Sequence, residues 1–376
     1  MKKALLLLLS ASFYCSFAVL SAAAENVVYP GAALQTVGTS GNSLAPTGSD
    51  SGKSNSLSDN IVTVSSGNVG GDVFGAVNIS AGDSQAVKNN SVIIDSGTIQ
   101  YCAYGGYAGK SSGNTVTGNS VVVNGGKVTS VFGGTIVDGV NGNITGNNVI
   151  INTGTVVNTA CGGYMRDGGG NNISGNTITV NGGTVGDGLY GVYGGLIETS
   201  GSNGNITGNE VNILGGTVNG SVYGGSNNSS GAVNYNKVTF SSGTIEGNVY
   251  GGYSNSVSSN SNVIGNSLTI NGGTVEIYAY GGCVNVSSGS AIANTLTVNG
   301  GTLNNNIHGG CVNDGTGKVT DNIVIITSGI FNGYIYGGFN GGSGGASGNI
   351  LTINGGAVTK NVHGCFVEKG DAVNSQ

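Results

Sequence analysis

The sequence predicts an all-β protein, a single-stranded parallel β-helix (solenoid) of about eleven turns, each with roughly 29 residues and three short strands. Two observations lead to this fold class. One sequence motif recurs eleven times, with an Asn seven residues before a Gly in every copy. The glycines of successive copies lie roughly 27 to 33 residues apart. Apolar and polar residues alternate around this pair, as in a strand with one buried face. A propeller blade needs about 40 residues or more, so it fits the period poorly.

The chain begins with the features of a signal peptide, residues 1–24. Lys2 and Lys3 precede an apolar run from Ala4 to Leu20, and small residues follow at Ala22 to Ala24. This pattern predicts export through the inner membrane, to the cell surface, the outer membrane or the extracellular space. Elsewhere no apolar run is long enough to span a bilayer, so we expect no membrane-spanning segment in the mature chain.

Three further segments follow the leader. Residues 25–58 are expected to form an N-terminal cap or linker, because both prolines of the chain lie there and the repeats have not begun. Residues 59–365 are the predicted repeat array. Residues 366–376 form a C-terminal tail that resembles the linker before a further turn, so we expect a truncated reading frame.

The charge balance argues against a polyanionic partner. The chain has 11 basic and 17 acidic residues, a formal net charge of −6. Removal of the leader takes this to about −8, and Arg166 is the only arginine. Because phosphate binding needs clustered Lys and Arg, nucleic acid is not an expected partner.

Each copy of the repeat predicts three strands. The residues five and three before the Gly are apolar in every copy, as at Val62 and Val64, and give the first strand. The residue two after the Gly is apolar again and marks a second, short strand. Most copies then carry a small apolar residue, an aromatic and Gly-Gly, as at 222–225, which we interpret as a third strand ending at a corner. The Ser, Gly and Asn residues from there to the next Asn vary in number, so we expect them to bulge from the surface.

The recurring Asn predicts a structural ladder. Equivalent residues of stacked turns lie about 4.8 Å apart, and an Asn amide both donates and accepts, so each can bond to the next. The expected ladder consists of Asn60, Asn90, Asn119, Asn147, Asn176, Asn209, Asn236, Asn266, Asn294, Asn322 and Asn349.

The motif Asn-x-Val-x-Val-x-Gly-Gly-Thr-Val, followed by Val-Tyr-Gly-Gly behind a bacterial signal peptide, resembles the passenger repeats of autotransporters of the type V secretion class. The resemblance covers about residues 59–365. It implies a Gram-negative, outer-surface or secreted β-helical stalk, often involved in adhesion or biofilm formation. The expected partners are host or neighbouring-cell surface molecules or glycans, bound through many weak contacts without catalysis.

One departure from this family concerns the C-terminus. Autotransporters end in a translocator β-barrel, whereas this sequence stops at Gln376. If the frame is complete, the last turn exposes an unpaired edge that favours self-association.

The alternative function is a secreted β-helical carbohydrate-active enzyme, a polysaccharide lyase or glycosidase. Its best candidate pair is Glu246 and Glu276, which share a position on adjacent turns and are expected about 4.8 Å apart. That position follows a buried one and should face solvent, so we expect surface charge and no catalytic residue.

Cysteine and histidine suggest two further sites. Cys283 and Cys311 share a position on neighbouring turns, which makes them a candidate disulfide in an exported protein. His308 and His363 occupy the slot that holds Tyr or Phe in most turns, and they are expected about 10 Å apart, too far for one metal to bridge. No metal or other cofactor is therefore expected.

Overall fold

The computed structural model describes residues 26–29, 57–79, 84–109, 113–167, 169–199, 203–256, 261–286, 288–370 and 372–373. The predicted signal peptide, residues 1–24, lies outside the described residues. So does most of the predicted cap, residues 25–58.

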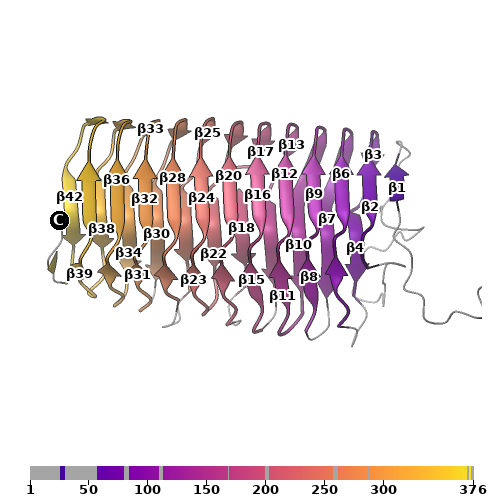
Figure 1. Cartoon of the computed structure of the whole chain (residues 1–376), viewed down its shortest axis with the longest axis horizontal. Helices are drawn as coiled ribbons and strands as arrows, with labels where there is room; N and C mark the ends of the chain where they lie inside the picture. The colour runs from indigo at the N-terminus through magenta and orange to yellow at the C-terminus, as the bar shows by residue number, and fades with distance from the viewer. Residues whose placement is uncertain are drawn as a thin grey trace, which may run out of the picture.

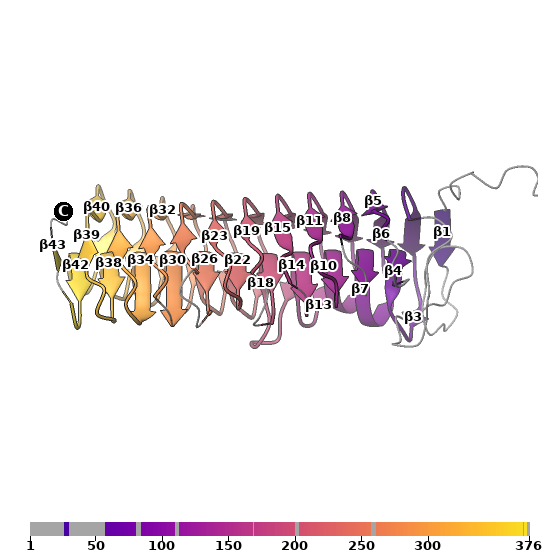
Figure 2. The same cartoon turned by 90° about the horizontal axis from the view of Figure 1, so that it is seen from below.

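The protein is a parallel β-solenoid, which confirms the predicted fold class. The chain coils so that each turn pairs with the turns before and after it, and all strand pairings within the described residues are parallel. Figure 1 shows the turns side by side along one axis, from the N-terminal indigo end to the C-terminal yellow end, and Figure 2 shows the same rod turned by 90°. Three sheets, here called A, B and C, run along the rod.

Sheet A holds the first predicted strand of each copy, in which the second and fourth side chains point inward, as in β9, and it begins with one strand, β1, from the predicted cap. Its strands are β1 Asn26–Tyr29, β2 Ile61–Val64, β6 Ser91–Ile94, β9 Ser120–Val123, β12 Asn148–Ile151, β16 Thr177–Val180, β20 Glu210–Ile213, β24 Lys237–Phe240, β28 Ser267–Ile270, β32 Thr295–Val298, β36 Ile323–Ile326 and β40 Ile350–Ile353.

Sheet B receives two strands from most turns, a two-residue strand after the Gly corner and a longer one. The short strands are β3 Asn68–Val69, β13 Thr155–Val156, β17 Thr184–Val185, β21 Thr217–Val218, β25 Thr244–Ile245, β29 Thr274–Val275, β33 Thr302–Leu303, β37 Ile330–Phe331 and β41 Ala357–Val358. The longer ones are β4 Val73–Asn78, β14 Ala160–Arg166, β18 Val192–Ile197, β22 Val222–Asn227, β26 Val249–Ser254, β30 Ala279–Val286, β34 Ile307–Asp314, β38 Ile335–Asn340 and β42 Val362–Val367. In β7 Thr98–Gly109 and β10 Lys127–Val137 the two are continuous.

The predicted end of the third strand at Gly-Gly is wrong. In β22 the strand continues past Gly224 and Gly225 to Asn227, because the glycines allow the backbone to bend while pairing resumes beyond them. The prediction that the following stretch only bulges from the surface is also incomplete, because it contains a further strand.

That further strand belongs to sheet C. Its members are β5 Val87–Lys88, β8 Thr115–Thr117, β11 Asn143–Thr145, β15 Asn172–Ser174, β19 Ile206–Thr207, β23 Val233–Asn234, β27 Val263–Ile264, β31 Ala291–Ile292, β35 Val319–Thr320, β39 Ala346–Ser347 and β43 Ala372–Val373. Paired strands therefore extend past residue 365 into the predicted tail.

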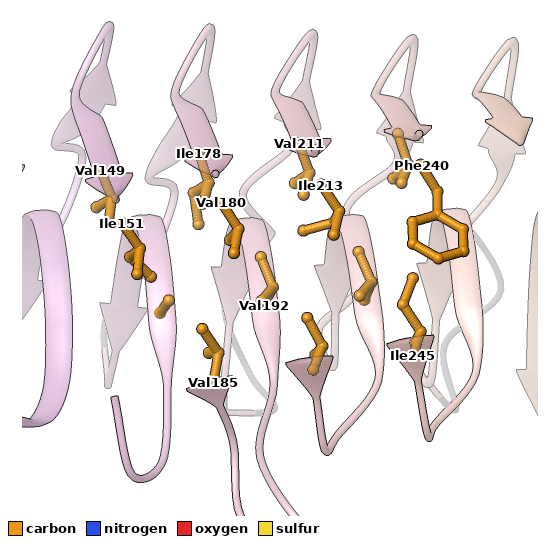
Figure 3. Packing of buried hydrophobic residues seen from close by; sticks show 14 of the residues in the cluster. Val149, Ile151, Ile178, Val180, Val185, Val192, Val211, Ile213, Phe240 and Ile245 are labelled. Carbon is orange, nitrogen blue, oxygen red and sulfur yellow. The ribbon is translucent and has the colours of Figure 1, made fainter. Parts of the chain in front are cut away.

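The main core lies between sheet A and the first part of sheet B. Val149 and Ile151 from β12 belong to the same buried cluster as Ile178 and Val180 from the next turn. Equivalent residues continue the stack along the rod (Figure 3). Side chains of this cluster are completely or almost completely buried. Since each turn covers its neighbour's apolar face, the turns stabilise one another.

A second, smaller core lies between sheet C and the residues of sheet B beyond Gly-Gly. Ile144 and Ile173 of sheet C pack here with Ile136, Met165 and Ile197 of sheet B. An analogous cluster continues this core toward the C-terminus. The cross-section therefore has two apolar compartments, and the conserved spacing of the repeat places a polar column between them.

Candidate functional site

The eleven predicted Asn residues form that polar column. All are fully buried, and from Asn60 to Asn322 each side-chain Nδ2 donates to the Oδ1 of the Asn one turn further on, at 2.6 to 3.0 Å. The same Oδ1 also accepts from the backbone N–H of the preceding Asn, at 2.9 to 3.1 Å. The ladder is thus continuous over ten steps.

Each Asn from Asn119 onward also donates to sheet C, and Asn90 donates to the equivalent residue, Leu57. In each case the Nδ2 reaches a backbone carbonyl of the previous turn at 2.9 to 3.4 Å, as from Asn147 to Val116. The second Gly of Gly-Gly lies against this amide: a Cβ on Gly225 would lie 2.8 Å from Asn236 Nδ2. The column therefore joins all three sheets and occupies buried space that no ligand can enter.

The outer face of sheet B has a different character. The residue before Gly-Gly points outward in each turn and is aromatic in most turns, forming what we call column 1. Column 1 consists of Phe74, Tyr104, Phe132, Cys161, Tyr193, Tyr223, Tyr250, Tyr280, His308, Tyr336 and His363, all paired in register.

Most rings of column 1 stack face to face. Successive stacked centroids are 4.7 to 5.3 Å apart, close to the strand spacing that brings them together. Burial raises the pKa of Tyr193, Tyr250 and Tyr280, because the charged phenolate would lose its hydration in this column. The ring faces are covered by neighbouring rings, and the edges form the floor of the outer face.

A second outward column follows three residues later. Column 2 consists of Val77, Tyr107, Thr135, Tyr164, Leu196, Ser226, Tyr253, Cys283, Cys311, Phe339 and Phe366. Residues three apart in a straight strand point to opposite faces, so the bend at Gly-Gly brings both columns to the outside. Their rings meet, as for Tyr250 and Tyr253 with centroids 4.7 Å apart.

This face contains a hollow of about 430 Å³. Column 2 carries the small Ser226 here, between Leu196 and Tyr253. Among the described residues its lining consists of Ser130, Phe132, Asn158, Thr159, Tyr164, Leu189, Tyr190, Tyr193, Leu196, Glu198, Tyr223, Ser226, Asn228, Tyr253 and Asn255. The hollow combines an aromatic floor with hydroxyl and amide groups at its rim.

One wall of the hollow comes from a departure from the repeat. The next core residue after Val185 is Val192, seven positions further along the chain. In the neighbouring turns the same interval is four positions. The longer connection projects near β18 in Figure 2 and places Leu189 and Tyr190 in solvent, 84% and 45% exposed. Asp187 accepts hydrogen bonds from the backbone N–H groups of both residues, at 3.1 and 3.2 Å, which fixes the connection.

The charged group in this lining is Glu198. Tyr164 donates its hydroxyl to the Glu198 carboxylate, and burial together with this bond raises the pKa of Tyr164. The backbone oxygen of Glu198 accepts from Asn228 Nδ2 at 3.0 Å. These bonds hold polar groups in place along one side of the hollow.

The candidate disulfide is not formed. Cys283 and Cys311 pair in register and are both fully buried, but both are free thiols. Directly paired residues on parallel strands keep their Cβ atoms near the strand spacing of about 4.8 Å, longer than the roughly 3.5 to 4.5 Å that a disulfide prefers. Burial and the neighbouring Cys283 raise the pKa of the Cys311 thiol.

The two histidines replace aromatic rings, as the sequence predicts. His308 stacks between Tyr280 and Tyr336, and His363 stacks on the other face of Tyr336 at 5.3 Å. Burial lowers the pKa of His308 to about 3. Within the described residues, no group of three or more His, Cys, Asp or Glu side chains is placed to hold a metal ion.

The predicted acidic pair lies away from the hollow. Glu246 and Glu276 are exposed at equivalent positions of adjacent turns, and the Glu276 N–H donates to Ile245 O. The Glu276 carboxylate accepts from Asn304 Nδ2 at 2.7 Å.

Sequence reasoning missed the hollow, although the longest interval between repeat glycines, Gly183 to Gly216, marks it. Comparisons with protein-family models, with curated proteins and with solved structures find no match. Over the part of the chain that the structure describes, no helix has the length and apolar character needed to cross a bilayer.

Proposed function

We propose that the chain is an exported, surface-displayed passenger of the autotransporter type, which acts as a stalk and binds other surfaces without catalysis. The observation that carries the proposal is the outer face of sheet B, where two columns of side chains repeat in register on successive turns. A target that contacts one turn weakly can contact many turns at once, so avidity replaces a single strong site.

The internal ladder supports this role. Buried hydrogen bonds between Asn side-chain amides join each turn to the next, in addition to the three sheets. The rod therefore keeps its outer groups at a fixed spacing. A stiff array loses little conformational entropy when it binds a repetitive surface.

The enzyme alternative has one observation in its favour, the hollow with Glu198. Glycosidases of the usual kind place two carboxyl groups about 5 to 9.5 Å apart across the scissile bond. Among the lining residues that the structure describes, Glu198 is the one carboxylate, and it is hydrogen-bonded to Tyr164. The aromatic, hydroxyl and amide groups of the lining suit the binding of a ligand, whereas the described lining does not supply the second carboxyl group that hydrolysis needs. We therefore favour a binding role.

The test is expression of the chain, with its leader and with an autotransporter-type translocator β-barrel fused after Gln376, in a Gram-negative host that lacks other adhesins. We expect surface labelling of the chain, and faster sedimentation of the cells or binding of the cells to epithelial monolayers. The matched control carries the same leader on an unrelated passenger. The proposal would be contradicted by a chain that stays in the cytoplasm. It would also be contradicted by cells that display the chain but neither aggregate nor bind.

A further inference from the structure

We propose that the hollow lined by Tyr190, Tyr193, Ser226 and Tyr253 binds a short segment of a neutral oligosaccharide. This inference rests on the proposed binding function and deepens it, since it assigns the class of ligand and the turns that recognise it. The hollow's volume, about 430 Å³, lies within the range of roughly 300 to 1,000 Å³ typical of small-molecule sites.

The floor suits the apolar faces of sugar rings. Tyr193 and Tyr223 stack at 4.8 Å, and Tyr253 packs against Tyr223 at 5.5 Å, so the edges of their rings form a continuous apolar floor. Such a surface covers C–H groups, while phenol hydroxyls can exchange hydrogen bonds with a hydroxylated ligand. Ser226, only 4% exposed, leaves the space that a larger column 2 side chain would fill.

The rim suits sugar hydroxyls. Asn228 is held by its bond to Glu198 O, and Asn255 accepts from Asn285 Nδ2 at 2.8 Å, so both amides are oriented before a ligand arrives. Ser130 and Thr159 add hydroxyl groups to the lining. Fixed donors and acceptors beside an apolar floor are the combination that small polar ligands need.

The charge and the strand pairing exclude two other occupants. Glu198 brings negative charge to the lining, and the chain's net charge is −6, which disfavours acidic glycans. A peptide that binds by strand addition needs a free sheet edge. Here β22 is already paired with both β18 and β26.

Tyr190 is the residue that distinguishes this turn from its neighbours. It is 45% exposed on the fixed connection, beside the buried floor, so it can cover a ligand from the side without supporting the core. Its replacement should therefore change binding and leave folding intact.

The test measures binding of the full mature chain to immobilised neutral hexasaccharides of glucose, mannose, galactose and N-acetylglucosamine, with heparin and polygalacturonate as acidic probes. We expect one of the neutral probes to bind. Tyr190→Ala should raise its Kd about tenfold, as loss of an aromatic anchor does. Ser226→Tyr should abolish binding, because it places in the hollow the same side chain that Tyr253 places at the equivalent column 2 position of the next turn.

The matched control is Tyr235→Ala, because Tyr235 is 65% exposed and lies outside the hollow's lining. Its Kd should equal that of the wild type, and the melting temperatures of Tyr190→Ala and Tyr235→Ala should match the wild type. Binding to acidic probes only, to none of the probes, or equally by all variants would overturn the inference.

The outcomes also separate this inference from the proposed function. No glycan binding, or glycan binding that Tyr190→Ala and Ser226→Tyr leave unchanged, by a chain that still makes cells adhere would refute the glycan site and leave the adhesive role standing. Hollow-dependent glycan binding by a chain that confers no adhesion would support the site and refute the adhesive role.

Discussion

Asn266 and Asn294 lie 28 residues apart in the chain and one turn apart in the solenoid, and the Nδ2 of Asn266 donates to the Oδ1 of Asn294 at 3.0 Å. The Oδ1 of Asn266 accepts from the N–H and the Nδ2 of Asn236, both at 2.9 Å. Its Nδ2 also donates to Val233 O at 2.9 Å. A single buried amide thus satisfies polar groups of the preceding and the following turn.

Replacement of that amide should be costly. Asn266→Ala leaves the N–H and Nδ2 of Asn236 and the carbonyl of Val233 without these partners, and an unsatisfied buried group costs about 1 to 3 kcal/mol. We expect a loss of about 3 kcal/mol or more in the free energy of unfolding, measured by urea denaturation.

The matched control for this change is Asn271→Ala. Asn271 accepts from Asn299 Nδ2 at 2.9 Å in a similar stack, but on the exposed surface. Its loss should change stability by less than about 0.5 kcal/mol, because water replaces the partner. Equal effects of the two substitutions would contradict the claim that burial makes the ladder important.

The Gly beside the ladder should be equally restricted. A Cβ at Gly282 would overlap the Cγ of Asn294, so Gly282→Ala must displace the ladder or the strand. We expect a loss of about 2 kcal/mol, within the range of overpacked cores, measured as a lower melting temperature. Gly169→Ala is the control, since nothing lies within 4 Å of its added Cβ. A Gly282→Ala variant as stable as Gly169→Ala would refute the close approach.

The buried thiols should react slowly. Burial raises the pKa of Cys161 and Cys311, so little thiolate exists at pH 8 for alkylation. We expect iodoacetamide to modify these residues in the native mature chain far more slowly than in urea, as read by peptide mass spectrometry. Rapid native labelling of Cys311, or recovery of a peptide joined through Cys283 and Cys311, would show that the thiol assignment is wrong.

The parts of the fold that sequence predicts are those where side chains repeat in a fixed register. The Asn-to-Gly spacing and the apolar pairs such as Val62 and Val64 place sheet A and the main core directly. Sheet C escaped prediction because each turn contributes only two or three residues to it, too few to show alternation. Its signal was present, an apolar residue three before each ladder Asn, such as Val233 before Asn236, buried throughout the column.

The outer columns could not be assigned from alternation alone. At Gly224 the strand pairing is interrupted and it resumes at Gly225 in the same register; because the strand bends there, Tyr223 and Ser226 share one face although alternation places them on opposite faces. The hollow depends on this bend and on the three extra residues before Val192. Both are local departures from the repeat, whereas a repeat-based prediction averages over the turns.

His308 provides a pH-dependent prediction. It is 4% exposed and its ring lies among Tyr278, Tyr280, Tyr336 and Phe339, with burial as the cause that lowers its pKa to about 3. The unfolded chain binds a proton at about pH 6.5, while the folded chain does not. Stability from the neutral ring is therefore complete above pH 6.5 and is lost as the pH falls from there toward 3.

His308→Phe isolates this contribution, because Phe74 and Phe132 fill the same column in other turns without a titratable group. From pH 7 to pH 5 the wild type should lose about 2 kcal/mol relative to His308→Phe, as expected for a proton bound only by the unfolded chain. Urea denaturation at both pH values measures the difference, in which other titrating groups cancel. A gap that stays constant between the two pH values would mean that the folded chain also accepts the proton and that the ring is not sealed between its tyrosine neighbours.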